Sequence, residues 1–243
     1  MTLLMLMPGM DGTGDLFAPL IHALGPSQPV QVVRYPVDRA WGYAELQRCA
    51  REQLPAQEPF VLLGESFSGP MAWRLAASAG PRLRGLVLCC TFLSHPMALL
   101  GPLADWASRW PLHHVPRGLI NRYFLGPDAD VATQALLHTT LARVAPQALR
   151  ARMQAVLRLK PPHDSLPPDL PVLCLRAAQD WIVPRCASRP LARRLPRAQQ
   201  VELQGPHGLL QAQPAASAKV IAEFMQRLGR GDGRTDTGQG KVR

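Results

Sequence analysis

No apolar stretch in this 243-residue sequence approaches the roughly 20 residues that span a membrane. The first apolar stretch, residues 2–7, lacks a charged segment before it, and Pro8 and Gly9 interrupt it, so we interpret it as a strand and not as a signal peptide. Hydrophobic residues still make up 47% of the chain, which is enough for a sizeable core. These features predict one large domain, or two small ones, without a transmembrane segment.

Cysteine is scarce, and its spacing shows no pairing. The five cysteines are an odd number, and no two of them form a CxxC motif. Cys89, Cys90 and Cys174 lie in apolar runs, where cysteine packs as a small hydrophobic side chain. This pattern argues against a disulfide framework and against a zinc site, and it favours a reducing, cytoplasmic location. We expect neither a metal nor a cofactor.

Aromatic residues are few, at 6% of the chain, and they do not interleave with the basic residues to form a stripe. The formal net charge is +10 and is carried almost entirely by arginine. Such a charge can attract nucleic acid, an anionic membrane surface or an acidic substrate. Because the arginines are scattered, we expect a solvated basic surface and no nucleic-acid site.

The stretch that carries the chemistry is residues 60–69. Its first four residues are apolar and predict a short buried strand, and a helix is expected directly after the stretch. Ser66 lies on the sharp turn between them, as in a nucleophile elbow, which strains the serine backbone and exposes its hydroxyl group. Such a turn needs small residues two positions before and after the serine, and Gly64 and Ser68 occupy these positions. The alternative is a buried strand that ends in an ordinary Ser/Gly turn.

A second candidate loop, residues 8–14, follows the first expected strand. Gly9, Gly12 and Gly14 occur in the reverse of the dinucleotide-binding order, and the loop has no P-loop lysine. A glycine-rich loop can instead bring a backbone N–H group close to a developing negative charge, and Met10 is our candidate donor. A plain tight turn is the alternative.

Strands alternate with helices along most of the chain. We expect strands at residues 3–7, 30–35, 60–63, 84–90, 171–176 and 200–203, and helices at residues 15–24, 41–54 and 215–228. This alternation predicts an α/β fold, with a mainly parallel sheet and helices on both faces. In such sheets, sites form at the C-terminal ends of the strands, where Ser66 and Met10 both lie.

Residues 93–168 interrupt this alternation and have no clear strand pattern. We expect four helices here, near residues 98–109, 117–124, 129–144 and 146–159. We interpret the segment as a helical cap that is inserted after the fourth strand and lies over the crevice. The α/β core then consists of residues 1–92 and 169–229, and the polar, basic residues 230–243 are expected to form a disordered tail.

The expected cap also supplies candidates for substrate contact. An apolar acyl pocket can be lined by three of its aromatic residues, although packing within the cap is the alternative for each: Trp106, Trp110 and Phe124. Three arginines near its end could instead favour an anionic substrate: Arg150, Arg152 and Arg158.

Asp180 and His207 each follow an expected strand, as Ser66 does. A serine hydroxyl group is a poor nucleophile until a base takes its proton, and histidine suits that role at neutral pH. A carboxylate then fixes the imidazole tautomer and stabilises the imidazolium. We expect Asp180 to be this carboxylate, and its rivals are Glu65, Asp164 and Asp169. Glu65 should point away from Ser66, because successive strand residues face opposite sides.

In this order and spacing, the motifs resemble the α/β-hydrolase superfamily over nearly the whole chain. Residues 8–14 look like the oxyanion loop of that family, and residues 64–69 look like its nucleophile elbow. Residues 180–184 look like its acid loop, and residues 205–207 look like its histidine loop. Two features depart from the pattern. Ser68 replaces the second glycine of the elbow, and the chain begins at the oxyanion strand, so it looks like a minimal version of the family.

The resemblance implies catalytic roles for Ser66, Asp180 and His207, with the backbone N–H groups of Met10 and Phe67 as the oxyanion hole. We expect a serine hydrolase that cleaves a small-molecule carboxylic ester or thioester through an acyl-serine intermediate. The same three side chains could serve acyl transfer or C–C bond hydrolysis. A non-catalytic binding protein on the same scaffold is an alternative of another class.

Overall fold

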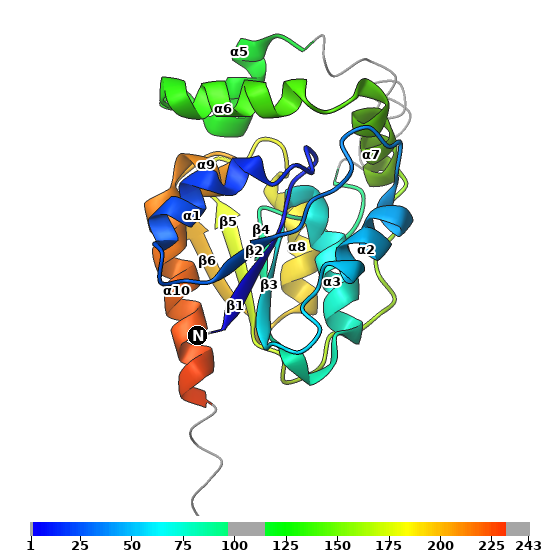
Figure 1. The fold of residues 1–243 in the computed structure, drawn as a ribbon, viewed down its shortest axis with the longest axis vertical. Helices are drawn as coiled ribbons and strands as arrows, with labels where there is room; N and C mark the ends of the chain where they lie inside the picture. The colour runs from blue at the N-terminus through cyan, green and yellow to red at the C-terminus, as the bar shows by residue number, and fades with distance from the viewer. Residues whose placement is uncertain (1, 97–114, 232–243) are drawn as a thin grey trace, which may run out of the picture.

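Parallel strands form the central sheet of the computed structural model, which describes residues 2–96 and 115–231 (Figure 1). Within these residues, the sheet has six strands in the order β2-β1-β3-β4-β5-β6, and each neighbouring pair is parallel. The strands are β1 (Leu3–Met7), β2 (Val30–Val32), β3 (Phe60–Glu65), β4 (Leu83–Cys89), β5 (Val172–Ala177) and β6 (Gln199–Leu203). The predicted α/β fold with a parallel sheet is confirmed.

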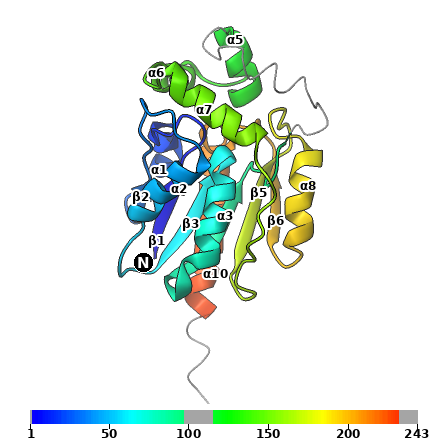
Figure 2. The ribbon, with the colours of Figure 1, turned by 90° about the vertical axis from the view of Figure 1, so that its right-hand side faces the viewer.

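Helices cover both faces of this sheet (Figures 1 and 2). One face is covered by α1 (Ala18–Leu24), α9 (Leu209–Ala212) and α10 (Pro214–Gly231). The other face is covered by α2 (Tyr43–Glu52), α3 (Gly69–Ser78) and α8 (Arg185–Arg194). None of the described helices combines the length and the apolar character of a membrane span.

The strand sequences explain the two-sided packing. Successive side chains of a strand point to opposite faces, so a strand between two helical layers has apolar side chains on both faces. In β3, Leu62 packs in the core under α2, α3 and α8, whereas Leu63 packs under α1, α9 and α10, and both are fully buried. This burial on both faces makes the centre of the sheet rigid at the point where β3 delivers Ser66.

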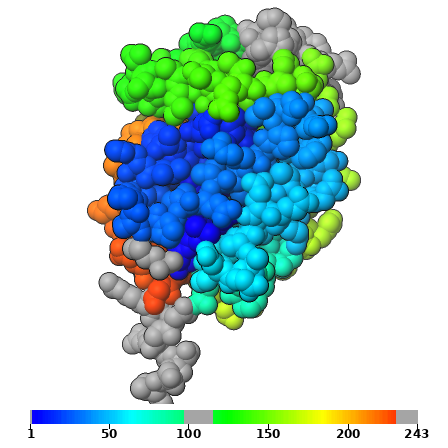
Figure 3. All heavy atoms as spheres, viewed as in Figure 1, coloured from blue at the N-terminus to red at the C-terminus, as the bar shows by residue number. Residues whose placement is uncertain are grey.

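Three further helices lie above the carboxyl ends of the strands, at the top of Figure 1. They are α5 (Arg117–Ile120), which continues into a π-helical turn (Asn121–Leu125), α6 (Val131–Ala142) and α7 (Pro146–Leu157). A small apolar cluster of Leu16, Leu125 and Leu137 joins the π-helical turn and α6 to the N-terminal part of the chain. Figure 3 shows the green atoms of this segment seated directly on the blue atoms that follow β1 and β2.

Several predicted boundaries differ from the observed ones. β2 ends at Val32, not at residue 35, because it pairs with β1 over only three residues at the edge of the sheet. The predicted helix 15–24 begins with a 3₁₀ turn (Asp15–Phe17), and α9 was not predicted. α10 extends to Gly231, so the predicted tail at 230–243 begins too early, and the predicted helix at 98–109 lies outside the described residues.

Candidate active site

Ser66 lies at the sharp turn that joins β3 to α3. Its φ is +48°, in the left-handed region that residues other than glycine rarely adopt, so the turn is strained there. A short 3₁₀ turn (Ser66–Ser68) leads directly into α3. The N–H groups of this first helical segment lack intrahelical partners and carry the positive end of the helix dipole. The hydroxyl group of Ser66 is therefore held beside donors that suit an anion.

The tight packing of strand against helix explains the small residues around Ser66. A Cβ atom on Gly64 would lie 2.6 Å from the Cβ atom of Ala72, and a Cβ atom on Gly69 would lie 2.0 Å from Oγ1 of Thr91. Glycine is therefore required at both positions. After Ser66, the position at which a side chain would collide is that of Gly69 and not that of Ser68. A serine is therefore tolerated at position 68.

The structure brings Ser66, His207 and Asp180 together, although they are far apart in the sequence. Oγ of Ser66 lies 2.8 Å from Nε2 of His207, and Nδ1 of His207 lies 2.8 Å from Oδ2 of Asp180. The side chains of His207 and Asp180 are only 3% and 7% exposed. These contacts form a continuous chain of hydrogen bonds from a carboxylate to a hydroxyl group, largely shielded from water.

The other oxygen of Asp180 fixes the orientation of the carboxylate. Oδ1 accepts hydrogen bonds from the backbone N–H groups of Ile182 at 3.0 Å and Val183 at 2.7 Å. Because both donors belong to the loop after β5, the carboxylate turns toward His207 with little freedom to rotate. A carboxylate in this position can hold the imidazole in the tautomer with the proton on Nδ1.

Phe124 is the predicted pocket residue whose position the structure describes. Its ring meets the imidazole ring of His207 edge to face, with centroids 5.8 Å apart. Its carbonyl oxygen accepts a hydrogen bond of 2.7 Å from the N–H group of Gly208, where a Cβ atom would collide with that oxygen. Phe124 therefore contacts the histidine loop directly. The other two candidates, Trp106 and Trp110, lie outside the described residues.

The loop after β1 lies next to the turn at Ser66. β1 and β3 are neighbours in register, with Met7 opposite Gly64, so the two strands end side by side. Ser68 donates a hydrogen bond through its hydroxyl group to the carbonyl oxygen of Pro8 and so joins the loop to the turn. Met10, the predicted oxyanion donor, follows in this same loop. Its N–H group and that of Phe67 thus belong to two adjacent segments.

A family model described as serine aminopeptidase, S33, matches residues 43–210, which is more than half of the chain. The chain belongs to this family of α/β hydrolases. No curated protein matches the sequence.

Solved structures support the same fold for this hydrolase. The enol-lactonase from Burkholderia xenovorans LB400 is 16% identical, with a TM-score of 0.77 over 93% of this chain and 91% of that chain. An esterase from Exiguobacterium antarcticum is 11% identical, with a TM-score of 0.74 over 93% and 92% of the two chains. A thermophilic esterase from Thermogutta terrifontis is 18% identical, with a TM-score of 0.71 over 94% and 90%. At these identities the likeness shows the fold.

Glu65 precedes Ser66 in the hydrolase but points elsewhere, as the alternation along β3 predicts. Its carboxyl group accepts a hydrogen bond of 3.0 Å from the side-chain amide of Gln211. Burial raises the pKa of Glu65 to about 7. The other two rivals of Asp180 are exposed, at positions Asp164 and Asp169. Asp180 is the carboxylate that His207 contacts.

The raised pKa of Glu65 predicts a pH-dependent stability. The folded protein keeps the proton on Glu65 up to about pH 7, whereas the unfolded chain releases it near 4.5. The free energy of unfolding should therefore fall as the pH rises between these values, by on the order of 3 kcal/mol. Glu65→Gln should abolish this fall and be more stable than the wild type at pH 8. Chemical denaturation at pH 4 and pH 8 measures both effects.

The exposed Glu58, in the loop before β3, offers the matched control. Glu58→Gln should leave the pH dependence of stability as in the wild type. A Glu65→Gln variant that is less stable than the wild type at pH 8 would contradict this prediction. The ionised carboxylate would then stabilise the fold by more than its burial costs.

Sequence reasoning missed the role of Arg152 in the hydrolase. We predicted that Arg150, Arg152 and Arg158 could face an anionic substrate, but Arg152 is fully buried and binds backbone carbonyl oxygens. Arg150 and Arg158 are exposed. One signal was available: Arg152 occupies the same helical face as Ala148 and Val156, four residues away on either side, and both are buried.

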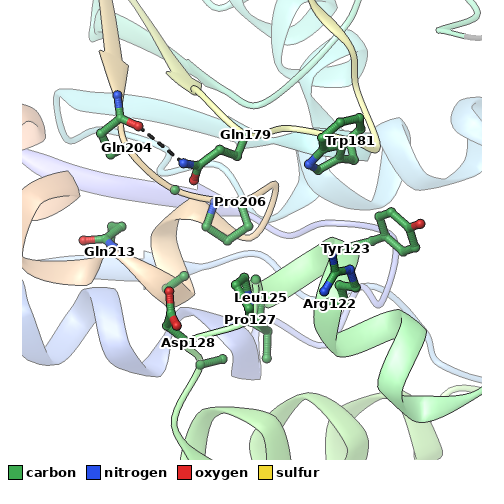
Figure 4. A pocket seen from close by; sticks show the side chains of 14 residues that line it. Arg122, Tyr123, Leu125, Pro127, Asp128, Gln179, Trp181, Gln204, Pro206 and Gln213 are labelled. Atoms are coloured by element: carbon green, nitrogen blue, oxygen red, sulfur yellow. Dashed lines mark hydrogen bonds between the residues drawn. The ribbon is translucent and has the colours of Figure 1, made fainter.

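A hollow of about 650 Å³ lies beside the loops that carry Asp180 and His207 (Figure 4). Trp181, Gln179 and Pro206 line it from these loops, and Arg122 and Tyr123 line it from the π-helical turn. Ser66 is not among its lining residues, so this hollow is not the predicted acyl pocket. In the described part of the chain, no three His, Cys, Asp or Glu side chains gather as ligands for a metal ion.

Proposed function

We propose that this hydrolase cleaves a carboxylic ester or a thioester through an acyl-serine intermediate. One observation carries the proposal: Oγ of Ser66 lies 2.8 Å from Nε2 of His207, whose Nδ1 lies 2.8 Å from Oδ2 of Asp180. These are hydrogen-bonding distances for a nucleophile, its general base and the group that orients the base. The strained backbone of Ser66 supports the same role, because such strain gathers at functional sites.

In the acylation half of the reaction, Ser66 attacks the carbonyl carbon of the substrate. Nε2 of His207 takes the hydroxyl proton as the Oγ–C bond forms, and Asp180 stabilises the resulting imidazolium. The negative charge that develops on the carbonyl oxygen is met by the N–H groups of Met10 and Phe67. When the carbonyl group re-forms, the bond to the alcohol or thiol breaks, and the leaving group takes the proton from His207.

Water completes the cycle. His207 takes a proton from the water molecule as its oxygen attacks the acyl-serine carbonyl group, and the same N–H groups stabilise the second oxyanion. The Oγ–C bond then breaks and Ser66 recovers its proton, which releases a carboxylic acid. Ester chemistry is supported by three proteins of the same fold, two esterases and an enol-lactonase, since a lactone is a cyclic ester.

We also propose that residues 93–168 act as a cap over this site. The contact of Phe124 with His207 places part of this segment against the reacting groups. A cap excludes water and so strengthens the oxyanion contacts in a medium of low dielectric constant.

We also propose that the protein is located in the cytoplasm. All five cysteines are free, and the thiol group of Cys89 donates a hydrogen bond to Sγ of Cys90 at 3.9 Å, as expected in a reducing compartment.

The test is labelling by a fluorophosphonate, followed by kcat/KM for a series of esters and thioesters from acetyl to octanoyl. We expect labelling of Ser66 and a kcat/KM that rises by a few-fold per methylene at first, because each buried methylene stabilises a bound chain by about 0.8 kcal/mol. A lactone and an ester with a free carboxylate extend the series.

The outcomes separate the parts of the proposal. The absence of labelling and of turnover across the whole series would contradict the serine-hydrolase assignment. Turnover with a flat chain-length profile, or with a clear preference for the carboxylated ester, would leave the chemistry in place and contradict an apolar acyl pocket.

A further inference from the structure

Arg152 of α7 is buried completely and reaches across to the loop after β1. Its Nη1 donates hydrogen bonds to the carbonyl oxygens of Met10 at 2.8 Å and Asp11 at 2.7 Å. Its Nη2 donates to the carbonyl oxygen of Pro36 at 2.7 Å. One guanidinium group therefore binds three backbone carbonyl groups, two of them in the segment that contains the predicted oxyanion donor.

Three neighbours of Arg152 accommodate its buried guanidinium group: Asp11, Tyr35 and Gly12. Burial lowers the pKa of Arg152, while the charge of Asp11 opposes that shift. The guanidinium carbon also lies 5.9 Å from the centre of the Tyr35 ring, in a cation–π contact. Gly12 has a φ of +73°, and a Cβ atom there would lie 2.7 Å from Nη1 of Arg152. The loop thus has its glycine where the guanidinium group approaches.

Two further carbonyl groups of the loop are also held. The Pro8 carbonyl oxygen accepts a hydrogen bond from the hydroxyl group of Ser68. The Gly9 carbonyl oxygen accepts from the N–H group of Gly12 at 3.2 Å. In a trans peptide unit the C=O and N–H bonds point in opposite directions, so a fixed Gly9 carbonyl group fixes the direction of the next N–H group, that of Met10.

Met10 therefore lies between two fixed points. Gly12 holds the peptide unit on its N-terminal side, and Arg152 holds the peptide unit on its C-terminal side. Its own N–H group has no hydrogen-bond partner among the residues that the structure describes. A buried loop usually satisfies its N–H groups, so a held but unpaired donor is suited to a transient acceptor such as an oxyanion.

We propose that Arg152 is a positioning residue for the reaction: by fixing the carbonyl groups of Met10 and Asp11, it keeps the N–H group of Met10 aimed at the developing oxyanion. The inference rests on the proposed function. It also gives the helical segment a part in the chemistry, since Arg152 belongs to α7 and not to the sheet. Arg152 does not contact the substrate itself, because the three carbonyl oxygens and complete burial enclose it.

The test compares Arg152→Met with Arg48→Met, which changes an exposed arginine of α2. Arg152→Met should lower kcat for an activated ester by roughly 10²-fold, the loss expected for one oxyanion donor, with KM changed by no more than a few-fold. Arg48→Met should stay within about twofold of the wild type in both constants.

A second measurement distinguishes a misplaced oxyanion donor from a general loss of structure. The wild type should hydrolyse an oxygen ester much faster than the matched thionoester, in which sulfur replaces the carbonyl oxygen, because sulfur is a weaker hydrogen-bond acceptor. If Arg152 aims the oxyanion donor, this preference should shrink by about tenfold in Arg152→Met. Arg152→Lys keeps the charge and can bind fewer carbonyl groups at once, so it should show an intermediate loss, and it serves as the folded variant if Arg152→Met does not fold.

The results separate this inference from the proposed function. An active wild type with an unchanged kcat in the folded Arg152 variants would overturn the inference alone. A lower kcat with an unchanged preference for the oxygen ester would overturn it as well, since the arginine would then act on folding or packing in general. An inactive wild type, together with an inactive Arg48→Met variant, would overturn the proposed function and the inference with it.

Discussion

Ser66→Ala is expected to lower kcat for ester hydrolysis by on the order of 10³- to 10⁶-fold, while the protein keeps its fold. The substitution removes the oxygen that lies 2.8 Å from Nε2 of His207 and leaves the imidazole with no proton to take. Alanine retains the Cβ atom of serine, so the backbone at φ +48° is no more strained than before. Initial rates and the thermal unfolding temperature measure activity and folding separately.

Ser78, exposed at the C-terminal end of α3, offers a matched control for this substitution. Ser78→Ala should retain full activity and full labelling by a fluorophosphonate. If the Ser66→Ala variant were labelled as the wild type is, the nucleophile would be another residue, and the interpretation of the turn at Ser66 as a nucleophile elbow would be wrong.

Much of the fold could be predicted because the sheet is buried on both faces. The first four residues of β3 are all apolar, and such runs stand out between helices with polar faces. Parallel strands also end at one edge of the sheet, so residues that follow separate strands can be expected to meet. This reasoning gave Ser66, Asp180 and His207 as neighbours, and the structure places them within hydrogen-bonding distance.

The residues that hold the site could not be predicted in the same way. The helical spacing of Arg152 with Ala148 and Val156 indicates burial but not its partners, which are backbone carbonyl groups more than 100 residues away. A sequence pattern does not show which backbone groups a side chain will bind. The length of β2 was overestimated for a related reason, because pairing at a sheet edge depends on the neighbouring strand and not on the apolar residues alone.

Ser68 shows how a departure from a family pattern can be explained by three-dimensional contacts. The sequence alone marks it as a serine where the elbow usually has glycine. In the structure its hydroxyl group lies 2.8 Å from the hydroxyl group of Tyr35 and also donates to the carbonyl oxygen of Pro8. The residue therefore links the two loops of the candidate site, and Gly69 supplies the close approach to Thr91 that a glycine is needed for.

The second large effect is expected at Asp180. Its Oδ1 accepts two backbone N–H groups, and its Oδ2 faces Nδ1 of His207 at 2.8 Å. In Asp180→Asn the amide oxygen can keep the two backbone hydrogen bonds, because only the oxygen is an acceptor. The amide NH₂ group then faces Nδ1 and donates a hydrogen bond to it, which forces the imidazole proton onto Nε2. With that proton bound, Nε2 cannot accept the proton of Ser66.

We therefore expect Asp180→Asn to lower kcat by roughly 10³- to 10⁴-fold with little change in structure, because the tautomer and not the geometry is wrong. Asp169→Asn, at an exposed position before β5, is the control and should be fully active. A steady-state assay of both variants makes the comparison. Near-normal activity of Asp180→Asn would mean that another carboxylate orients His207, and Glu65, the buried neighbour of Ser66, would then be the one to test, since Asp164 and Asp169 are exposed.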